Sequence, residues 1–322
     1  MITVHNISKQ YRKVQALSGI SFSVGKGEIF GLIGPDGAGK TTLFRILTTL
    51  ILADSGTATL NGWDIVHDYS RIRKKVGYMP GRFSLYPTMT VEENLDFFAT
   101  LFRTTIAENY DLIKDIYSQI EPFKDRMAGK LSGGMKQKLA LSCALIHRPL
   151  VLFLDEPTTE LAKRDTGRTL YILDEPTTGI DPVSRKELWA MLQKLKSEGI
   201  TIVVSTPYMD EAMMCDRIAM IQKGSIMTID TPQGIIDKMP QKIFAVKAHN
   251  MSCLLADLRK FENTETCHTF GEFHHITFRY DNEKLCDEIK FYLQKLGYNG
   301  VEIKEIEPTI EDCFMNLTDS LI

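Results

Sequence analysis

The chain lacks most of the features that mark specialised classes of protein. Its six cysteines lie far apart and form no C-x-x-C pair, which argues against a zinc site and a clustered disulfide framework. Acidic and basic residues nearly balance, at a formal net charge of −3, so nothing general favours nucleic acid as a partner. No apolar run approaches the roughly 18 residues of a membrane helix. Residues 1–6 also lack the basic and then apolar order of a signal peptide.

The order of predicted elements indicates the class of fold. The 322 residues are enough for one large domain and one small one. Strand-like and helical segments alternate as far as Met239, which is typical of an α/β sheet with crossover helices. We therefore predict one domain over residues 1–239 and a second over residues 240–322.

A glycine-rich segment follows an apolar strand early in the chain. The strand is predicted over Gly27 to Ile33 and the next helix over Thr42 to Leu50. Between them, residues 34–42 have the order G-x-x-x-x-G-K-T: Gly34, Pro35, Asp36, Gly37, Ala38, Gly39, Lys40, Thr41 and Thr42. In this context backbone N–H groups face phosphates, Lys40 reaches the β and γ oxygens, and Thr41 ligates Mg²⁺. The predicted cofactors are ATP and Mg²⁺.

A serine and two glycines begin a later predicted helix. They lie in residues 131–135, Leu131-Ser132-Gly133-Gly134-Met135, and form a second anion cradle at a helix N-terminus. Residues 34–42 match a phosphate-binding P-loop. Placed after this P-loop, residues 131–135 resemble the signature of the ABC-type ATPases, which contacts the γ-phosphate held by the opposite subunit. The resemblance covers residues 1 to about 234. It implies an α/β P-loop NTPase cassette with a mixed, largely parallel sheet and a helical signature subdomain.

Two more positions match that family. Tyr11 matches the aromatic residue that stacks on adenine, although a tyrosine on a strand surface is the simpler alternative. Asp181, in Gly179-Ile180-Asp181-Pro182, matches the loop that touches the partner subunit's site. The resemblance therefore adds both residues to the nucleotide site.

Two polar residues of the family are missing. Gly81 stands where the family has a glutamine, and Pro207 stands where it has a histidine after the strand Thr201 to Thr206. Neither side chain can position a water or donate to a γ-phosphate. We expect this site to hold ATP but to hydrolyse it poorly, unless a water and the catalytic glutamate suffice.

An apolar run that ends in Leu-Asp-Glu-Pro-Thr-Thr occurs twice, over residues 151–159 and 170–178. Such a strand presents one carboxylate to the Mg²⁺ shell and a second to the attacking water. The candidate metal ligands are Asp155 and Asp174, and the candidate catalytic bases are Glu156 and Glu175. Since there is one P-loop, only one copy is expected to occupy the central strand.

Different observations favour each copy as the central strand. The first continues the usual interval from the signature helix, whereas the second runs directly into Gly179-Ile180-Asp181 and a predicted helix over Ser184 to Ser197. Residues 160–178 read as an insertion, and their content resembles the excision-repair branch of ABC ATPases. Connection length favours the first copy and integrity of the site favours the second. We favour Asp174 and Glu175 by a small margin.

The pattern of predicted strands and helices changes after Met239. Strands are predicted over 241–248, 272–280 and 301–306, with helices over 252–261 and 283–296. A small βαββαβ-like, ferredoxin-like α+β domain is expected, whose last segment resembles the accessory tail of ABC-2 type exporter cassettes. His268, His274 and His275 are expected to be core or solvated histidines, because neighbours on a strand face opposite ways.

Two classes of function follow from the resemblance. The first is the ATP-binding subunit of a multidrug-type exporter, which drives a separate ABC-2 type permease through cassette dimerisation, at the cytoplasmic face of the inner or plasma membrane. In that reading the partner is a second cassette, identical or not, whose site the signature of this chain completes. The second class is a soluble ABC ATPase of DNA repair or of the ribosome. The single P-loop and the exporter-like tail favour the first class.

Overall fold

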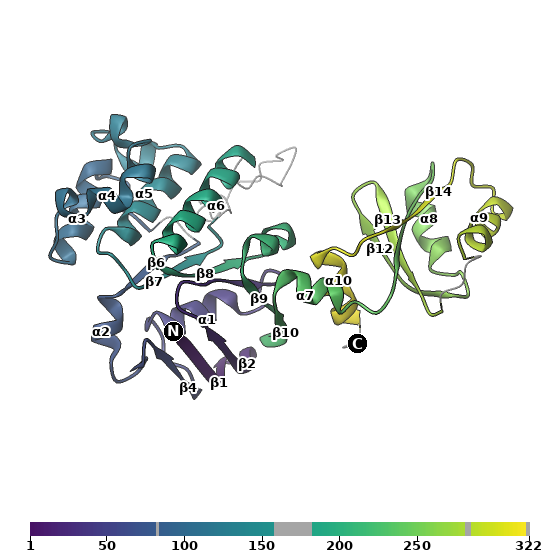
Figure 1. Cartoon of the computed structure of the whole chain (residues 1–322), viewed down its shortest axis with the longest axis horizontal. Helices are drawn as coiled ribbons and strands as arrows, with labels where there is room; N and C mark the ends of the chain where they lie inside the picture. The colour runs from purple at the N-terminus through teal and green to yellow at the C-terminus, as the bar shows by residue number, and fades with distance from the viewer. Residues whose placement is uncertain (82–83, 158–181, 281–284, 320–322) are drawn as a thin grey trace. The chain divides into compact units, whose positions relative to one another are not determined.

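The computed structural model describes residues 1–81, 84–157, 182–280 and 285–319 (Figure 1). The chain divides into two compact units, Met1–Thr231 and Pro232–Ile322. The sequence predicts a boundary after Met239, whereas in the structure α7 (Pro232–Asp237) already belongs to the second unit.

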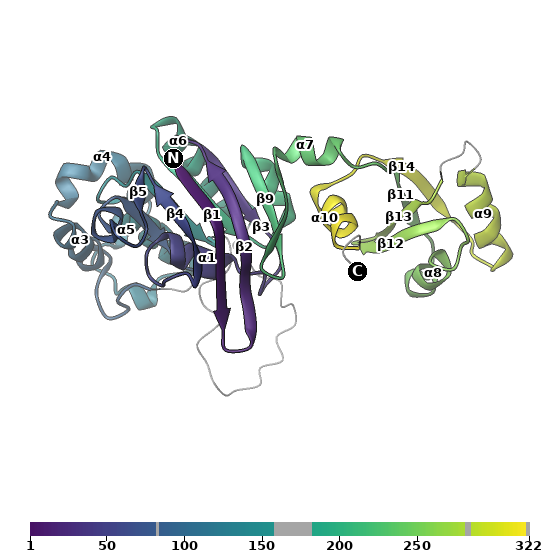
Figure 2. The same ribbon diagram turned by 90° about the horizontal axis from the view of Figure 1, so that it is seen from below.

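The first unit begins with an antiparallel sheet in the order β2-β1-β4-β5. Its strands are β1 (Ile2–Tyr11), β2 (Val14–Val24), β4 (Ser55–Leu60) and β5 (Trp63–Asp64). β1 and β2 form a long hairpin whose tip carries Tyr11, paired with Val14 (Figure 2). Alternate residues of these strands are buried, so one face of the sheet covers the core.

A six-stranded sheet in the order β10-β9-β3-β8-β7-β6 forms the centre of this unit. Its strands are β3 (Ile29–Ile33), β6 (Val76–Met79), β7 (Val151–Asp155), β8 (Thr201–Thr206), β9 (Arg217–Gln222) and β10 (Ser225–Asp230). Every neighbouring pair is parallel except β9 with β10. Every residue of β3, β7 and β8 is buried, as expected of parallel strands covered on both faces. The predicted mixed, largely parallel sheet is confirmed.

Helix α1 (Lys40–Leu47) packs against both sheets through one core. Leu43, Phe44, Ile46 and Leu47 are fully buried in it, and the Phe44 ring meets the Phe153 ring of β7 edge-on at 5.4 Å. The helix starts earlier and ends earlier than the predicted 42–50. It ends where Thr49 adopts a left-handed conformation, with φ of 64°.

The described part of the first unit contains further helices. They are α2 (Tyr69–Arg73), α3 (Val91–Leu101), α4 (Ile106–Tyr117), α5 (Gly133–Leu145) and α6 (Pro182–Ser197), with 3-10 turns at Glu121–Phe123, Ala128–Lys130 and Met209–Met214. Helices α3, α4 and α5 gather into one layer (Figure 1). Capping boxes at Thr90 and Thr105 begin α3 and α4. Buried Asn94 of α3 then holds the preceding loop through Tyr86, from whose N–H it accepts and to whose carbonyl it donates.

After α7, the second unit has the βαββαβ order followed by a further helix. The elements that follow α7 are β11 (Ile243–Lys247), α8 (Met251–Leu258), β12 (Thr264–Phe270), β13 (Phe273–Phe278), α9 (Leu285–Lys295), β14 (Glu302–Ile306) and α10 (Ile310–Asp319). The sheet is antiparallel, in the order β12-β13-β11-β14. The sequence did not predict β12 or α10 as separate elements. Among the described residues, no helix combines the length and apolar character needed to cross a membrane.

Three histidines of the second unit have polar partners. His275 Nδ1 lies 2.7 Å from Asp312 Oδ1, and His268 Nε2 lies 2.8 Å from Asp319 Oδ2, so two contacts join the sheet to α10. His274 is buried, and its Nε2 lies 2.7 Å from the carbonyl oxygen of Met251. Burial by itself raises the pKa of the Asp312 carboxyl, but hydrogen bonds from His275 and Thr309 outweigh it and leave the pKa lowered.

Candidate nucleotide site

Residues 34–42 connect β3 to the N-terminus of α1. Gly39 precedes the helix with φ of 106°, and a Cβ atom there would lie 2.5 Å from the carbonyl oxygen of Ala16, so only glycine fits. The helix has no side-chain cap, and its first turn holds no acidic residue. Its free N–H groups and the positive end of its dipole can therefore receive an anion.

The ammonium group of Lys40 lies inside this loop. The side chain is only 3% exposed, and its Nζ donates to the carbonyl oxygens of Gly34 at 2.8 Å and Pro35 at 3.1 Å. Its charge is balanced by Glu156, whose Oε1 lies 3.4 Å away. The loop thus holds a buried cation at the position where the sequence predicted contact with phosphate oxygens.

Thr41 meets the end of β7 at Asp155. The Thr41 hydroxyl donates to Asp155 Oδ1 at 3.2 Å, and buried Ser205 of β8 donates to the same oxygen at 2.7 Å. Hydroxyl and carboxylate oxygens are the ligands Mg²⁺ prefers, and it commonly takes one or two carboxylates beside substrate phosphates. This donor set fits such an ion. Groups of three or more His, Cys, Asp or Glu suited to a metal are absent from the described part of the chain.

Glu156 directly follows β7 in a left-handed conformation, with φ of 50°. Its N–H lies 2.9 Å from the carbonyl oxygen and 3.2 Å from the hydroxyl oxygen of Ser205. Sequence reasoning missed Ser205. A polar residue at the carboxyl end of the strand that neighbours the Asp-Glu strand was the signal that could have identified it.

The central strand consists of the first copy of the repeat. Residues Val151 to Leu154 pair with β6 on one side, and Val151 to Asp155 pair with β8 on the other. Our preference for the second copy in this strand was wrong, because the short link from Leu145 to Val151 already places the first copy beside β6. Asp174, Glu175 and Asp181 lie outside the described residues.

The two replaced family positions lie at the ends of strands beside Asp155. A Cβ atom at Gly81 would be 3.0 Å from the carbonyl oxygen of Asp155 and 3.7 Å from Glu156 Cβ. Pro207 follows β8 directly, where the N–H of Tyr208 turns back to Thr206 Oγ1 at 3.0 Å. Gly81 therefore lies against the backbone of Asp155 and the Cβ atom of Glu156, and it brings no polar side chain to this place.

The remaining predicted residues lie on other elements. Ser132 caps α5, accepting from the Met135 N–H at 3.4 Å, so Gly133 and Gly134 form the first turn of that helix in the helical layer. Tyr11 is 43% exposed at the hairpin tip, with the Lys9 ammonium 5.8 Å from the centre of its ring. An exposed aromatic face is available there for stacking.

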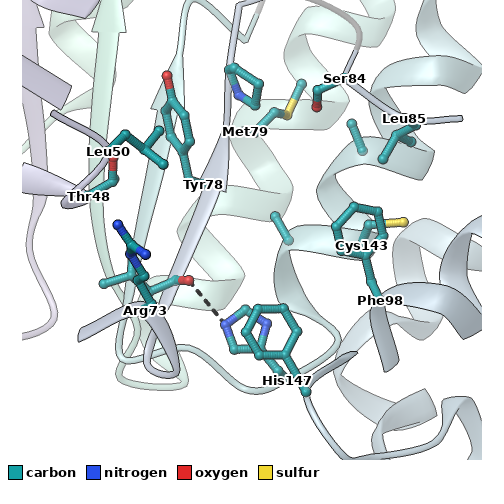
Figure 3. Close-up of a pocket in the computed structure, with 15 residues that line it drawn as sticks. Thr48, Leu50, Arg73, Tyr78, Met79, Ser84, Leu85, Phe98, Cys143 and His147 are labelled. Carbon is teal, nitrogen blue, oxygen red and sulfur yellow. Dashed lines mark hydrogen bonds between the residues drawn. The ribbon is translucent and has the colours of Figure 1, made fainter. Parts of the chain in front are cut away.

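A cavity of about 200 Å³ lies between the sheet and the helical layer (Figure 3). It is lined mainly by apolar groups, among them Leu50, Met79 and Phe98. His147 also lines it, with Nε2 3.1 Å from the carbonyl oxygen of Val76 and its ring stacked 3.8 Å from that of Phe102. Among the described residues, its Nδ1 has no hydrogen-bond partner.

The environment of His147 makes the stability of the fold depend on pH. Burial lowers its pKa to about 4, against an opposing contribution from the Val76 carbonyl. The unfolded chain therefore binds more protons between pH of about 4 and 6.5, so stability is complete above that window and is lost as pH falls through it. We expect His147 to account for about 3 kcal/mol of this loss.

Urea unfolding at a series of pH values checks this expectation. The variant His147→Gln should flatten the dependence between pH of about 6.5 and 4, since it cannot gain a proton. Exposed His67 provides the matched control, because His67→Gln should leave the slope unchanged. An unaltered slope in His147→Gln would assign the loss to other groups.

The sequence of the chain is similar to those of known proteins of one family. Residues 17–159 match the model of the ABC transporter family. The chain is 30% identical to the linearmycin resistance ATP-binding protein LnrL of Bacillus subtilis, over 99% of this chain and 98% of that protein. It is 36% identical to the Nod factor export ATP-binding protein I of Burkholderia orbicola, over 98% of this chain and 96% of that protein.

Other relatives differ in length or share the fold alone. The chain is 32% identical to the probable multidrug ABC transporter ATP-binding protein YbhF of Escherichia coli, but it spans only 52% of that protein. Among solved structures, the ATP-binding subunit of an ABC transporter aligns with a TM-score of 0.63 at 24% identity, over 74% of this chain and 92% of that one. A dimeric cassette with ADP and phosphate aligns with a TM-score of 0.61 at 23% identity, over 72% and 98%.

Proposed function

Since this chain belongs to the family of ABC transporter ATP-binding proteins, we propose that it binds Mg-ATP at residues 34–42 and drives a separate membrane permease. The observation that carries the proposal is the convergence of the P-loop with the end of β7. Lys40 meets Glu156 there at 3.4 Å, and Thr41 meets Asp155 at 3.2 Å. A cation for the phosphates, oxygens for the metal and a carboxylate for the water thus lie together.

Each residue has one role in this proposal. The N–H groups at the start of α1 and the Lys40 ammonium bind the β- and γ-phosphates, and Tyr11 stacks on the adenine. Thr41 and Asp155 hold Mg²⁺, which neutralises charge on the phosphates when bound. Glu156 accepts a proton from the water that attacks the γ-phosphate. Without a glutamine at Gly81 or a histidine at Pro207, hydrolysis at this site is slow.

A second cassette completes the working unit. Ser132, Gly133 and Gly134 begin α5, where free N–H groups can face the γ-phosphate bound by that partner. The signature is intact while the chain's own site lacks two polar groups, so the pair is asymmetric and the partner hydrolyses most of the ATP. Asp181 is assigned to the contact between the two cassettes.

The permease is a separate ABC-2 type membrane protein, and the chain acts at the cytoplasmic face of the membrane. This part of the proposal is supported by the relatives of the chain, which are named as ATP-binding proteins of linearmycin resistance and of Nod factor export. The apolar cavity beside His147, whose lining includes exposed Leu50, offers the permease a surface to contact. Co-purification with a membrane protein encoded beside it tests this partnership.

The role of the signature is tested by adding a charge to it. A Cβ atom at Gly134 would meet nothing closer than Ser184 Oγ at 3.9 Å, so Gly134→Asp fits without a clash, and an acidic residue in the first turn suits the helix. The carboxylate should nevertheless repel the partner's γ-phosphate. We expect Gly134→Asp to lower the ATPase rate of the mixed pair about tenfold.

The measurement compares this chain, its neighbouring cassette and their mixture. Gly134→Ala is the matched control, because it adds a methyl group without charge and should retain most of the rate. Fast turnover by this chain alone at low concentration, unaffected by Gly134→Asp, would refute the asymmetric pair.

A further inference from the structure

The geometry points to Ser205 as the residue that positions both carboxylates of the nucleotide site, an inference that rests on the Mg-ATP site proposed above. Ser205 does not itself contact phosphate in this assignment. It acts through Asp155, the metal ligand, and through Glu156, the base. It is therefore a positioning residue of the hydrolytic site.

The register of the sheet brings these residues together. In the parallel pairing of β7 with β8, Asp155 lies opposite Ser205, so their side chains leave the sheet on the same side. Ser205 is fully buried and Asp155 is 2% exposed. Water therefore competes little for the 2.7 Å hydrogen bond from Ser205 Oγ to Asp155 Oδ1.

A hydroxyl group suits this place because it donates once and accepts as well. The Ser205 proton goes to the Asp155 carboxylate, and an Oγ lone pair faces the Glu156 N–H at 3.2 Å. That N–H also meets the Ser205 carbonyl at 2.9 Å. One residue thus fixes the orientation of the carboxylate at the end of β7 and the left-handed backbone that aims the next one.

The absent glutamine gives this contact more weight. Gly81 lies against Asp155 and Glu156 but offers them no polar group, whereas the Thr41 and Ser205 hydroxyls both donate to Asp155 Oδ1. In the proposed site the Thr41 hydroxyl also serves Mg²⁺, whereas the Ser205 hydroxyl gives its proton to Asp155 at the shorter distance of 2.7 Å. Residues that orient a metal ligand typically change metal affinity about 10- to 100-fold when removed.

The test measures how nucleotide binding depends on Mg²⁺. Binding of a fluorescent ATP analogue to the full chain is titrated with Mg²⁺, and again in EDTA. For Ser205→Ala we expect half-maximal enhancement to need about tenfold more Mg²⁺, while the affinity in EDTA stays within about twofold of the wild type. Ser205→Cys, similar in size and a weak donor, should fall between the two and provides a second variant if alanine prevents folding.

Thr201 supplies the matched control. It is buried on the same strand, and its hydroxyl accepts from the Gly27 N–H at 2.9 Å, at the end remote from Asp155. Thr201→Val should lower the melting temperature without shifting the Mg²⁺ titration. An unchanged Mg²⁺ requirement in both Ser205 variants, or an equal shift in Thr201→Val, would overturn the inference. If the wild type bound nucleotide with no effect of Mg²⁺, the proposed function would fail first and the inference with it.

Discussion

Replacing Lys40 with alanine is expected to weaken the binding of Mg-ATP about 100-fold. The ammonium is 3% exposed, and it lies 3.4 Å from Glu156. Without it the Glu156 carboxylate remains near the phosphates with no opposite charge between them. Truncating one member of a buried charge pair commonly costs about 2 to 5 kcal/mol, and 100-fold lies within that range.

The measurement is a titration of the purified chain with a fluorescent ATP analogue in the presence of Mg²⁺. Lys194→Ala serves as the control, since Lys194 is exposed and pairs with Asp115 on the surface of the helices. That variant should bind nucleotide as the wild type does. Retained affinity in Lys40→Ala would place the phosphates elsewhere.

Glu156→Gln is expected to slow the chain's own ATP hydrolysis about 100-fold, the lower end of what a general base contributes. The amide keeps the size of the side chain but cannot accept the proton of the attacking water. Glu175→Gln is expected to change the rate less than about twofold, because the strand beside Thr41 is Val151–Asp155 and Glu156 follows it. Nucleotide binding should survive in both variants, since both retain the Lys40 ammonium and its hydrogen bonds to the carbonyl oxygens of Gly34 and Pro35.

Single-turnover hydrolysis with excess protein measures these slow rates without interference from product release. Glu187→Gln, a change on the surface of α6, controls for loss of a carboxylate that lies outside the site. A larger loss in Glu175→Gln than in Glu156→Gln would return the catalytic role to the second copy.

The sequence predicted the cassette well where one segment carries its own signal. The strand before residue 34, the glycine at position 39 and the following helix could be predicted from adjacent residues. Gly39 adopts φ of 106°, which favours glycine, and the helix begins without a side-chain cap. The alternation of strands and helices also predicted a largely parallel sheet, which the six-stranded order confirms. These features depend on neighbours in the chain.

Features that depend on distant segments were harder to predict. Both copies of the repeat offer the same apolar pattern, so the pattern could not identify the copy that pairs with β6 and β8. Ser205 was missed because its role arises from its position opposite Asp155 across two strands. Helix α10 was missed because part of what holds it comes from distant residues. Its Asp312 and Asp319 contact His275 of β13 and His268 of β12.

If nucleotide binds as proposed, the contact between Lys40 and Glu156 would respond differently to a triphosphate and to a diphosphate. A γ-phosphate that reaches Lys40 competes with Glu156 for the same ammonium and frees the carboxylate to take a proton from water. ADP is one phosphoryl group shorter and leaves more of the original ion pair in place. In the proposed site, hydrolysis would let Lys40 and Glu156 form again the pair that the free protein already has, and this would favour the release of phosphate.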